Sequence, residues 1–280
     1  MTETAKSSYG VELLYDIAPV FTKAEVLNHL RDRCGAVSAV DPASEDGLNF
    51  YFPAYRVPFK DDAMPVQVAI SVQDARLEDP ALEKALGRTL DWTEAKAAAE
   101  RHTAHVTLTD ILAVQLEYRS RLGLFQNVLQ GLMELVMPAA ILWRASMKVV
   151  DPMSLVQALR PGDARNPLYG AVNVRRFKSA DRPGRMLMDT LGLSAIGLPD
   201  FEVPFEGIEP SKIEAILWSL VRYQFDLGDV IADGRVFKVP GTKESWVCSR
   251  SPSRQPPTRE VIALKPQGAT TVRRLAPPDK

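Results

Sequence analysis

The stretch DTLGLSAIGLPDFEV, residues 189–203, is hydrophobic and is interrupted by two glycines and a proline. Its apolar, partly β-branched composition predicts strands. Glycine inside a strand typically marks a bulge or a close approach of two backbones, and proline marks an edge or a turn. The alternative interpretation is a loop that presents Gly192, Gly197 and Pro199 to a ligand or a partner. A phosphate-binding loop is not expected, because leucine and proline follow Gly197 where lysine and a hydroxyl residue are required.

Strands and helices are expected in mixed order on both sides of this stretch. Strands are expected over residues 11–15, 37–40, 48–52, 66–73, 105–109, 171–177, 186–196, 201–205 and 261–264, with a hairpin at 230–237. Helices are expected from Thr22 to Gly35, within 80–101 as two short helices or one bent one, over 114–149 with a kink at Pro138, around 154–159, and from Ser211. Capping boxes are expected at Thr22–Glu25, Asp91–Glu94 and Ser211–Glu214.

This order of elements predicts an α+β fold with mixed or antiparallel sheets and packed helices, arranged as two tightly associated lobes in one body. We expect a disordered N-terminus over residues 1–8, a body over 9–265 with lobes at 9–101 and 102–265, and a flexible tail over 266–280. The 280 residues are 46% apolar, which is enough to bury one large core or two smaller ones.

Charge and composition exclude several functional classes. The net charge of −1 comes from well-mixed signs, so we expect no nucleic-acid binding. The longest apolar stretch, residues 128–143, is shorter than the roughly 20 residues of a membrane-spanning helix, so no membrane insertion is expected. The first eight residues lack the apolar segment of a secretory signal, and Cys34 and Cys248 are not expected to pair. A cytoplasmic location is therefore expected, as a monomer or small oligomer.

Basic residues are concentrated between Arg160 and Arg185. We expect the side chains of Arg175, Arg176, Arg182 and Arg185 to be exposed on a strand pair, because burial of that many charges is costly. Together with Gly192, Gly197 and Pro199, these arginines are the predicted partner-binding residues. A solvated rim is the commonest explanation of such a run, and an edge that docks an acidic protein is the functional one.

The histidines at 102 and 105 are the candidates for chemistry. Two imidazoles leave a tetrahedral metal ion short of ligands, so we expect backbone hydrogen bonds and no metal. No nucleophile motif is present, and no catalytic residue or cofactor is expected. The competing hypothesis is a hydrolase or transferase whose site is assembled around His102, His105 and Asp110.

Four segments occur in an order that resembles a bacterial family of uncharacterised proteins, the domain of unknown function 4261. They are Ala104–Val106, Thr190–Leu193, Gly197–Val203 and Asp233–Gly234, and the likeness covers residues 10–265. The resemblance implies a cytoplasmic bacterial α+β protein with no assigned reaction. Some members of such families look like neighbours of toxin and secretion-system loci, and the resemblance therefore favours a protein-binding role.

From these observations we expect a non-enzymatic protein that binds another protein, as a toxin-immunity protein or as an accessory or component of a secretion system. Two other classes compete with this interpretation. One is the hydrolase or transferase described above, and the other is a structural subunit of a larger assembly, which would carry a large apolar surface.

Overall fold

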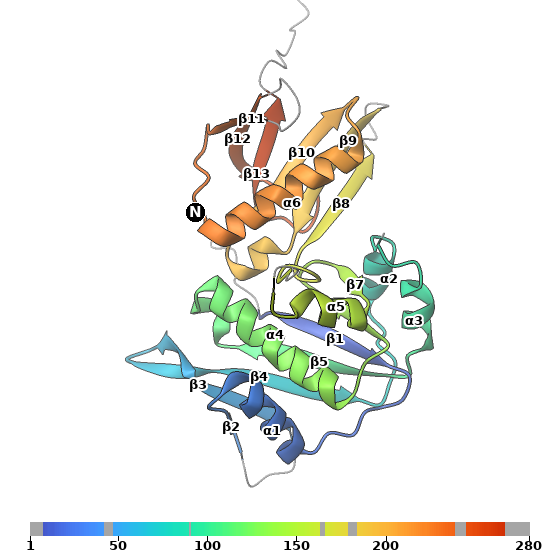
Figure 1. Ribbon diagram of the computed structural model, residues 1–280, viewed down its shortest axis with the longest axis vertical. Coiled ribbons are helices and arrows are strands. Elements are labelled where there is room, and N and C mark those ends of the chain that lie inside the picture. The colour runs from blue at the N-terminus through green and yellow to red at the C-terminus, as the bar shows by residue number, and fades with distance from the viewer. Residues whose placement is uncertain are drawn as a thin grey trace, which may run out of the picture. The chain divides into compact units, whose positions relative to one another are not determined.

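The computed structural model describes residues 8–41, 47–89, 91–162, 166–178, 184–238 and 245–266. These ranges contain six α-helices and two β-sheets, so the predicted α+β class with mixed and antiparallel sheets is confirmed. The chain divides into two compact units (Figure 1). Unit 1 comprises residues 1–175 and 190–198, and unit 2 comprises residues 176–189 and 199–280. The expected terminal segments lie almost wholly outside the described residues.

Unit 1 is built on a seven-stranded sheet in the order β2-β3-β4-β5-β1-β6-β7, with every neighbouring pair antiparallel. Its strands are β1 (Gly10–Tyr15), β2 (Ser38–Ala39), β3 (Leu48–Phe59), β4 (Asp62–Gln73), β5 (Ala104–Ile111), β6 (Ala140–Trp143) and β7 (Lys148–Val150). Because β5 lies between β4 and β1, residues on both sides of position 101 share this sheet. The observed division therefore differs from lobes at 9–101 and 102–265.

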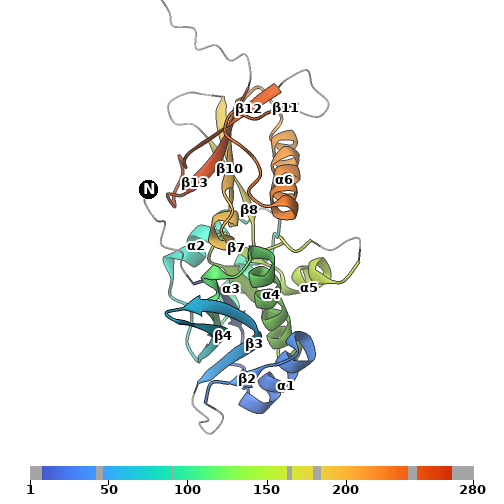
Figure 2. The same cartoon turned by 90° about the vertical axis from the view of Figure 1, so that its left-hand side faces the viewer.

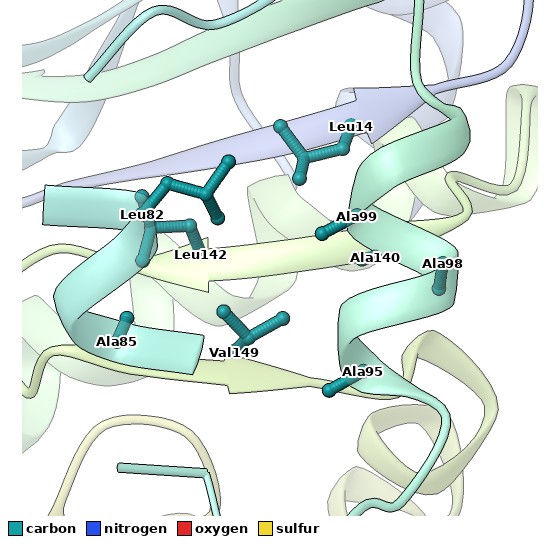
Figure 3. Packing of buried hydrophobic residues seen from close by; sticks show 9 residues of the cluster. All are labelled: Leu14, Leu82, Ala85, Ala95, Ala98, Ala99, Ala140, Leu142 and Val149. Carbon is teal, nitrogen blue, oxygen red and sulfur yellow. The ribbon is translucent and has the colours of Figure 1, made fainter. Parts of the chain in front are cut away.

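Helices cover both faces of this sheet. They are α1 (Lys23–Cys34), α2 (Pro80–Leu86), α3 (Ala95–Arg101), α4 (Tyr118–Leu135) and α5 (Pro152–Leu159), with a short 3-10 turn at Ala113–Gln115. On one face, leucines and alanines of α2 and α3 pack on Leu14 and Leu142 (Figure 3). Side chains alternate across a strand, so the next residue, Trp143, lies on the opposite face, where it contacts Phe125 of α4.

Two expectations for unit 1 helices are wrong. The long helix over 114–149 ends at Leu135, where Val136 turns to extended backbone, and Pro138 precedes the hairpin of β6 and β7 instead of kinking a helix. Every residue of β6 and β7 is buried, and such short apolar runs have no periodicity that separates helix from strand. The capping box at Thr22–Glu25 is confirmed, whereas α3 begins after Glu94 without a side-chain cap.

Unit 2 contains a mixed sheet in the order β11-β12-β13-β10-β9-β8. Its strands are β8 (Asn173–Lys178), β9 (Arg185–Leu191), β10 (Asp200–Glu206), β11 (Val236–Lys238), β12 (Ser245–Pro252) and β13 (Glu260–Pro266), and the ends of β8 and β9 extend into unit 1. The β10–β13 pair is parallel. Helix α6 (Pro210–Leu227) lies along one face of this sheet and packs on β10 (Figure 2).

Three expectations for the C-terminal half need correction. The strand expected over 186–196 ends at Leu191, and Leu193–Ile196 forms a 3-10 turn. Helix α6 begins one residue before Ser211 and has no capping box. The segment 230–237 is not a hairpin, because β11 pairs with β12 and the N–H of Gly234 donates to the carbonyl of Cys248 at 2.8 Å.

Candidate functional site

Exposed basic side chains gather where the sheet of unit 2 ends. Strand β8 is the last strand in the sheet order, and it carries the exposed residues Arg176 and Lys178. Arg185, also exposed, begins the neighbouring strand β9. We call Arg176, Lys178 and Arg185 the basic edge. Two of its three members share one face of β8, because side chains at i and i+2 point the same way.

Arg175 does not belong to the basic edge. Its side chain is only 2% exposed, so the expectation that it would be exposed is wrong. The reason is the two-residue repeat of a strand, which sends Arg175 and Arg176 to opposite faces. Arg182, which was expected beside them, lies outside the described residues.

The predicted glycine and proline positions are mostly enclosed. Gly192 has φ +132°, and a Cβ added there would lie 2.0 Å from the carbonyl oxygen of Ala171. This is the close approach of two backbones that a glycine within a strand pattern indicates, and only glycine fits it. Pro199 is buried, whereas Gly197 is exposed, with φ +94° and no neighbour within 4 Å of an added Cβ. Of the three, Gly197 alone is accessible.

A buried arginine binds the 3-10 turn after Gly192 within unit 1. The Nε of Arg121 donates to Asp110 Oδ2 at 2.6 Å, and its Nη1 donates to the carbonyl of Ala195 at 2.9 Å. Asp110 Oδ1 also accepts from the backbone N–H of Tyr9 at 2.7 Å. Both charged side chains are 4% exposed, so the pair forms a desolvated ionic contact that connects α4, β5 and the turn.

Another buried arginine, Arg259, lies within unit 2. Arg259 donates from Nε to Asp200 Oδ2 at 3.0 Å and from Nη2 to Asp189 Oδ2 at 2.8 Å. Both carboxylates have a side-chain exposure of 0%. The remaining nitrogen, Nη1, donates to the backbone carbonyls of Gln255 and Pro257 at 3.2 and 3.0 Å. One guanidinium therefore connects the two strands that flank residues 192–199 with the loop that leads into β13.

A third buried carboxylate lies on the same face as this cluster. Glu202 pairs in register with Asp189 across β9 and β10, and it is 1% exposed. It accepts from the backbone N–H of Arg254 at 2.8 Å and contacts the Arg254 side chain at 3.4 Å. Every carboxylate of this group thus has a basic partner, which is typical of a structural cluster and not of a site with a group held ready for proton transfer.

Both histidines of the catalytic hypothesis bind nearby backbone. His102 Nε2 accepts from the N–H of Leu77 at 2.9 Å, so Nδ1 carries the proton and donates to the carbonyl of Ala99. Burial lowers the pKa of His102, which keeps the ring neutral. His105 Nδ1 lies 2.8 Å from the carbonyl of Ala75. The prediction that these histidines hydrogen-bond to backbone is confirmed.

Asp110 lies near the other end of β5 from these histidines. Asp110 pairs with Val68 while His105 pairs with Gln73, five residues along β4. At about 3.3 Å per residue, five residues of strand separate their backbones by roughly 16 Å. The described residues therefore do not bring His102, His105 and Asp110 into one constellation.

The described residues contain neither a group of side chains that could bind a metal ion nor a cysteine activated for reaction. No group of three or more His, Cys, Asp or Glu side chains there is placed to hold a metal ion. Cys34 and Cys248 are both free, as expected. Burial raises the pKa of Cys34 to about 11 and also raises the pKa of Cys248, so both thiols are protonated at neutral pH.

The buried acidic residues of unit 2 were not predicted as a site. Their signal lies in the sequence Asp200-Phe201-Glu202-Val203, where two carboxylates stand at i and i+2 inside an otherwise apolar strand. This spacing places both on one face of β10 and demands basic partners if that face is buried. The partner Arg259 lies more than fifty residues away, and no local sequence pattern links its segment to β10.

Comparison with known proteins bears out the resemblance stated above over part of the chain. Residues 189–265 match the model of a domain of unknown function, DUF4261. The match begins at Asp189 and contains Asp200, Glu202 and Arg259, and so covers the whole buried cluster of unit 2. No curated protein and no solved structure matches the chain. None of the described helices is both long and apolar enough to cross a membrane.

Proposed function

We propose that this chain is a non-enzymatic binding protein whose basic edge docks an acidic, extended segment of another protein. The observation that carries the proposal is the position of Arg176 and Lys178, which are exposed on the last described strand of the unit 2 sheet. A terminal strand offers main-chain hydrogen-bonding groups to an added strand. Basic side chains along it select for acidic residues in that strand.

Four other arginines of the described residues differ from the basic edge, because they pair with carboxylates of the chain itself. Arg121 and Arg259 are buried and bound to carboxylates, so they serve the fold. Arg144 and Arg250 each bind two acidic side chains of the chain itself. The basic edge instead presents its charge to solvent. The family resemblance favours a toxin or a secretion-system component as the partner class.

Reversal of the edge charge tests the proposal. The variant Arg176→Glu/Lys178→Glu is used as bait in native lysate beside the wild-type chain, with captured proteins quantified by mass spectrometry. Its matched control is Arg222→Glu/Lys265→Glu, which makes the same charge change at two exposed positions elsewhere in unit 2. We expect a stoichiometric partner of the wild type to be lost from the edge variant and kept by the control.

The salt dependence of binding sharpens this test. With the captured partner purified, the edge variant should bind more slowly, and its affinity should depend less on salt than that of the wild type. Exposed charges on a terminal strand also protect against pairing between copies, and that role alone predicts equal partner capture by both variants. Equal capture, or no stoichiometric partner of the wild type, would reject the proposal.

A further inference from the structure

Helix α6 carries a second apolar stripe besides the one that it buries. Ile213, Leu217 and Val221 are fully buried against the unit 2 sheet. The second stripe, which we call the outer stripe, consists of Ile216, Leu220, Tyr223 and Leu227. Tyr223 is 37% and Leu227 55% exposed, and the other two residues are half-buried. Ile216 and Leu220 are thus less buried than Ile213, which is 0% exposed.

The spacing of these residues is that of a coiled-coil seam. From Ile213, apolar residues follow at intervals of 3, 4, 3 and 4, which gives Ile213, Leu220 and Leu227 the a positions and Ile216 and Tyr223 the d positions of a heptad. Intervals of three and four also occur in a helix that packs only on its own sheet. The distinguishing observation is that the outer stripe stays partly exposed beside the buried stripe, which leaves an apolar surface that fits another helix.

The charges beside the stripe indicate which helix that is. The g positions, seven residues apart, are Lys212, Ser219 and Asp226, and all three are exposed. A two-fold axis through Ser219 that runs the helices antiparallel brings Lys212 of one copy opposite Asp226 of the other, twice. A parallel pair would instead require the e positions, Leu217 and Gln224, and both are 0% exposed in the fold of the chain itself.

We propose that two copies of this chain associate through an antiparallel pair of α6 helices along the outer stripe. This inference is independent of the basic edge, which uses other residues of unit 2. The seam from Ile216 to Leu227 is about 17 Å long at 1.5 Å per residue. Because so short a seam holds only four apolar side chains from each copy, we expect it to bury less than the roughly 1,200–2,000 Å² of a stable interface. The dimer should therefore dissociate on dilution.

Sedimentation velocity of the full chain over a range of concentrations tests the association. We expect the weight-average mass to rise from that of a monomer toward that of a dimer as the concentration increases. The variant Leu227→Asp places a charge in the seam at an already exposed position, and it should sediment as a monomer throughout. The matched control Arg222→Asp lies at an exposed c position, outside the seam, and should associate like the wild type.

Exchange of the two g charges tests the antiparallel arrangement itself. Lys212→Asp and Asp226→Lys should each weaken the dimer, because each places like charges opposite one another at both ends of the seam. The double variant Lys212→Asp/Asp226→Lys should restore association. A change that merely perturbed the helix would not be rescued in this way, and circular dichroism of the three variants checks that the fold is kept.

Cross-linking locates the two-fold axis. In a Cys34→Ala background, Ser219→Cys should form a disulfide-linked dimer under mild oxidation, whereas Arg222→Cys should not. A wild-type chain that is monomeric at every concentration would overturn the proposal. So would a dimer that Leu227→Asp leaves unchanged, or one in which the charge exchange gives no rescue.

Discussion

Arg121 in unit 1 and Arg259 in unit 2 are both buried, but the two units balance the charge of these side chains differently. Arg121 in unit 1 pairs with the carboxylate of Asp110, which also accepts from the Tyr9 backbone. Arg259 in unit 2 lies between two fully buried carboxylates and also binds two backbone carbonyls. In unit 2, one guanidinium therefore balances two buried carboxylates, whereas in unit 1 it balances one. The unit 1 pair contains one carboxylate, so loss of its arginine leaves one buried negative charge unbalanced and not two.

Both arginines act on the same part of the chain, the segment that leaves unit 2 after Asp189 and returns to it at Pro199. Arg121 binds the carbonyl of Ala195 inside this segment, and Arg259 binds Asp189 and Asp200 at its two ends. Within unit 1, Arg121 therefore holds the turn inside this segment, and within unit 2, Arg259 holds the two strands that flank it.

Replacement of Arg259 by Met should give the largest effect, because it leaves two buried carboxylates without their shared guanidinium. Removal of one partner from a buried ionic group costs about 3–5 kcal/mol, and we expect about 5 kcal/mol here. Native-state hydrogen exchange with mass spectrometry should show the loss of protection in β9, β10 and β13, with unit 1 largely unaffected. Arg176→Met, at an exposed position, is the control and should change protection by less than about 0.5 kcal/mol.

Replacement of Arg121 by Met should have the next largest effect and should be confined to unit 1. Asp110 loses its ionic partner but still accepts the N–H of Tyr9, so we expect about 3 kcal/mol, the lower end for a buried pair. Peptides from β1, β5 and residues 190–198 should exchange faster, and those from β13 should not. An effect equal to that of Arg259→Met would contradict the proposed difference between the two clusters.

The sequence predicted elements well where a single local rule decided them. The capping box at Thr22 and the alternation of Val66, Val68 and Ile70 gave α1 and β4, and the structure has both. Prediction failed for β6 and β7, because strands buried on both faces have the same apolar composition as a buried helix. The sequence contains no local signal for that choice, which pairing with β1 decides.

Prediction of the site depended on the same distinction between local and distant information. The exposed positions of Arg176 and Arg185 followed from local crowding of charge, and the structure confirms both. The same argument failed for Arg175, since crowding says nothing about which face of a strand is buried. The Asp189–Arg259–Asp200 cluster joins residues up to 70 positions apart, so only the fold brings them together.

The smallest expected effect is a difference between the two units in how their stability depends on pH. All three histidines of the chain lie in unit 1. Burial lowers the pKa of His102 below its ordinary value of 6.5, so the unfolded state takes up a proton first as the pH falls. Unit 1 should therefore lose stability as the pH falls below about 6.5, while unit 2 should not change between pH 7.5 and 5.5. Urea unfolding is carried out at each pH, and the unfolded fraction of each unit is then measured by a short pulse of hydrogen exchange at one fixed labelling pH. His102→Gln keeps a donor and an acceptor but does not titrate, so it should flatten the response of unit 1. A slope that this variant leaves intact would show that His102 is not its source.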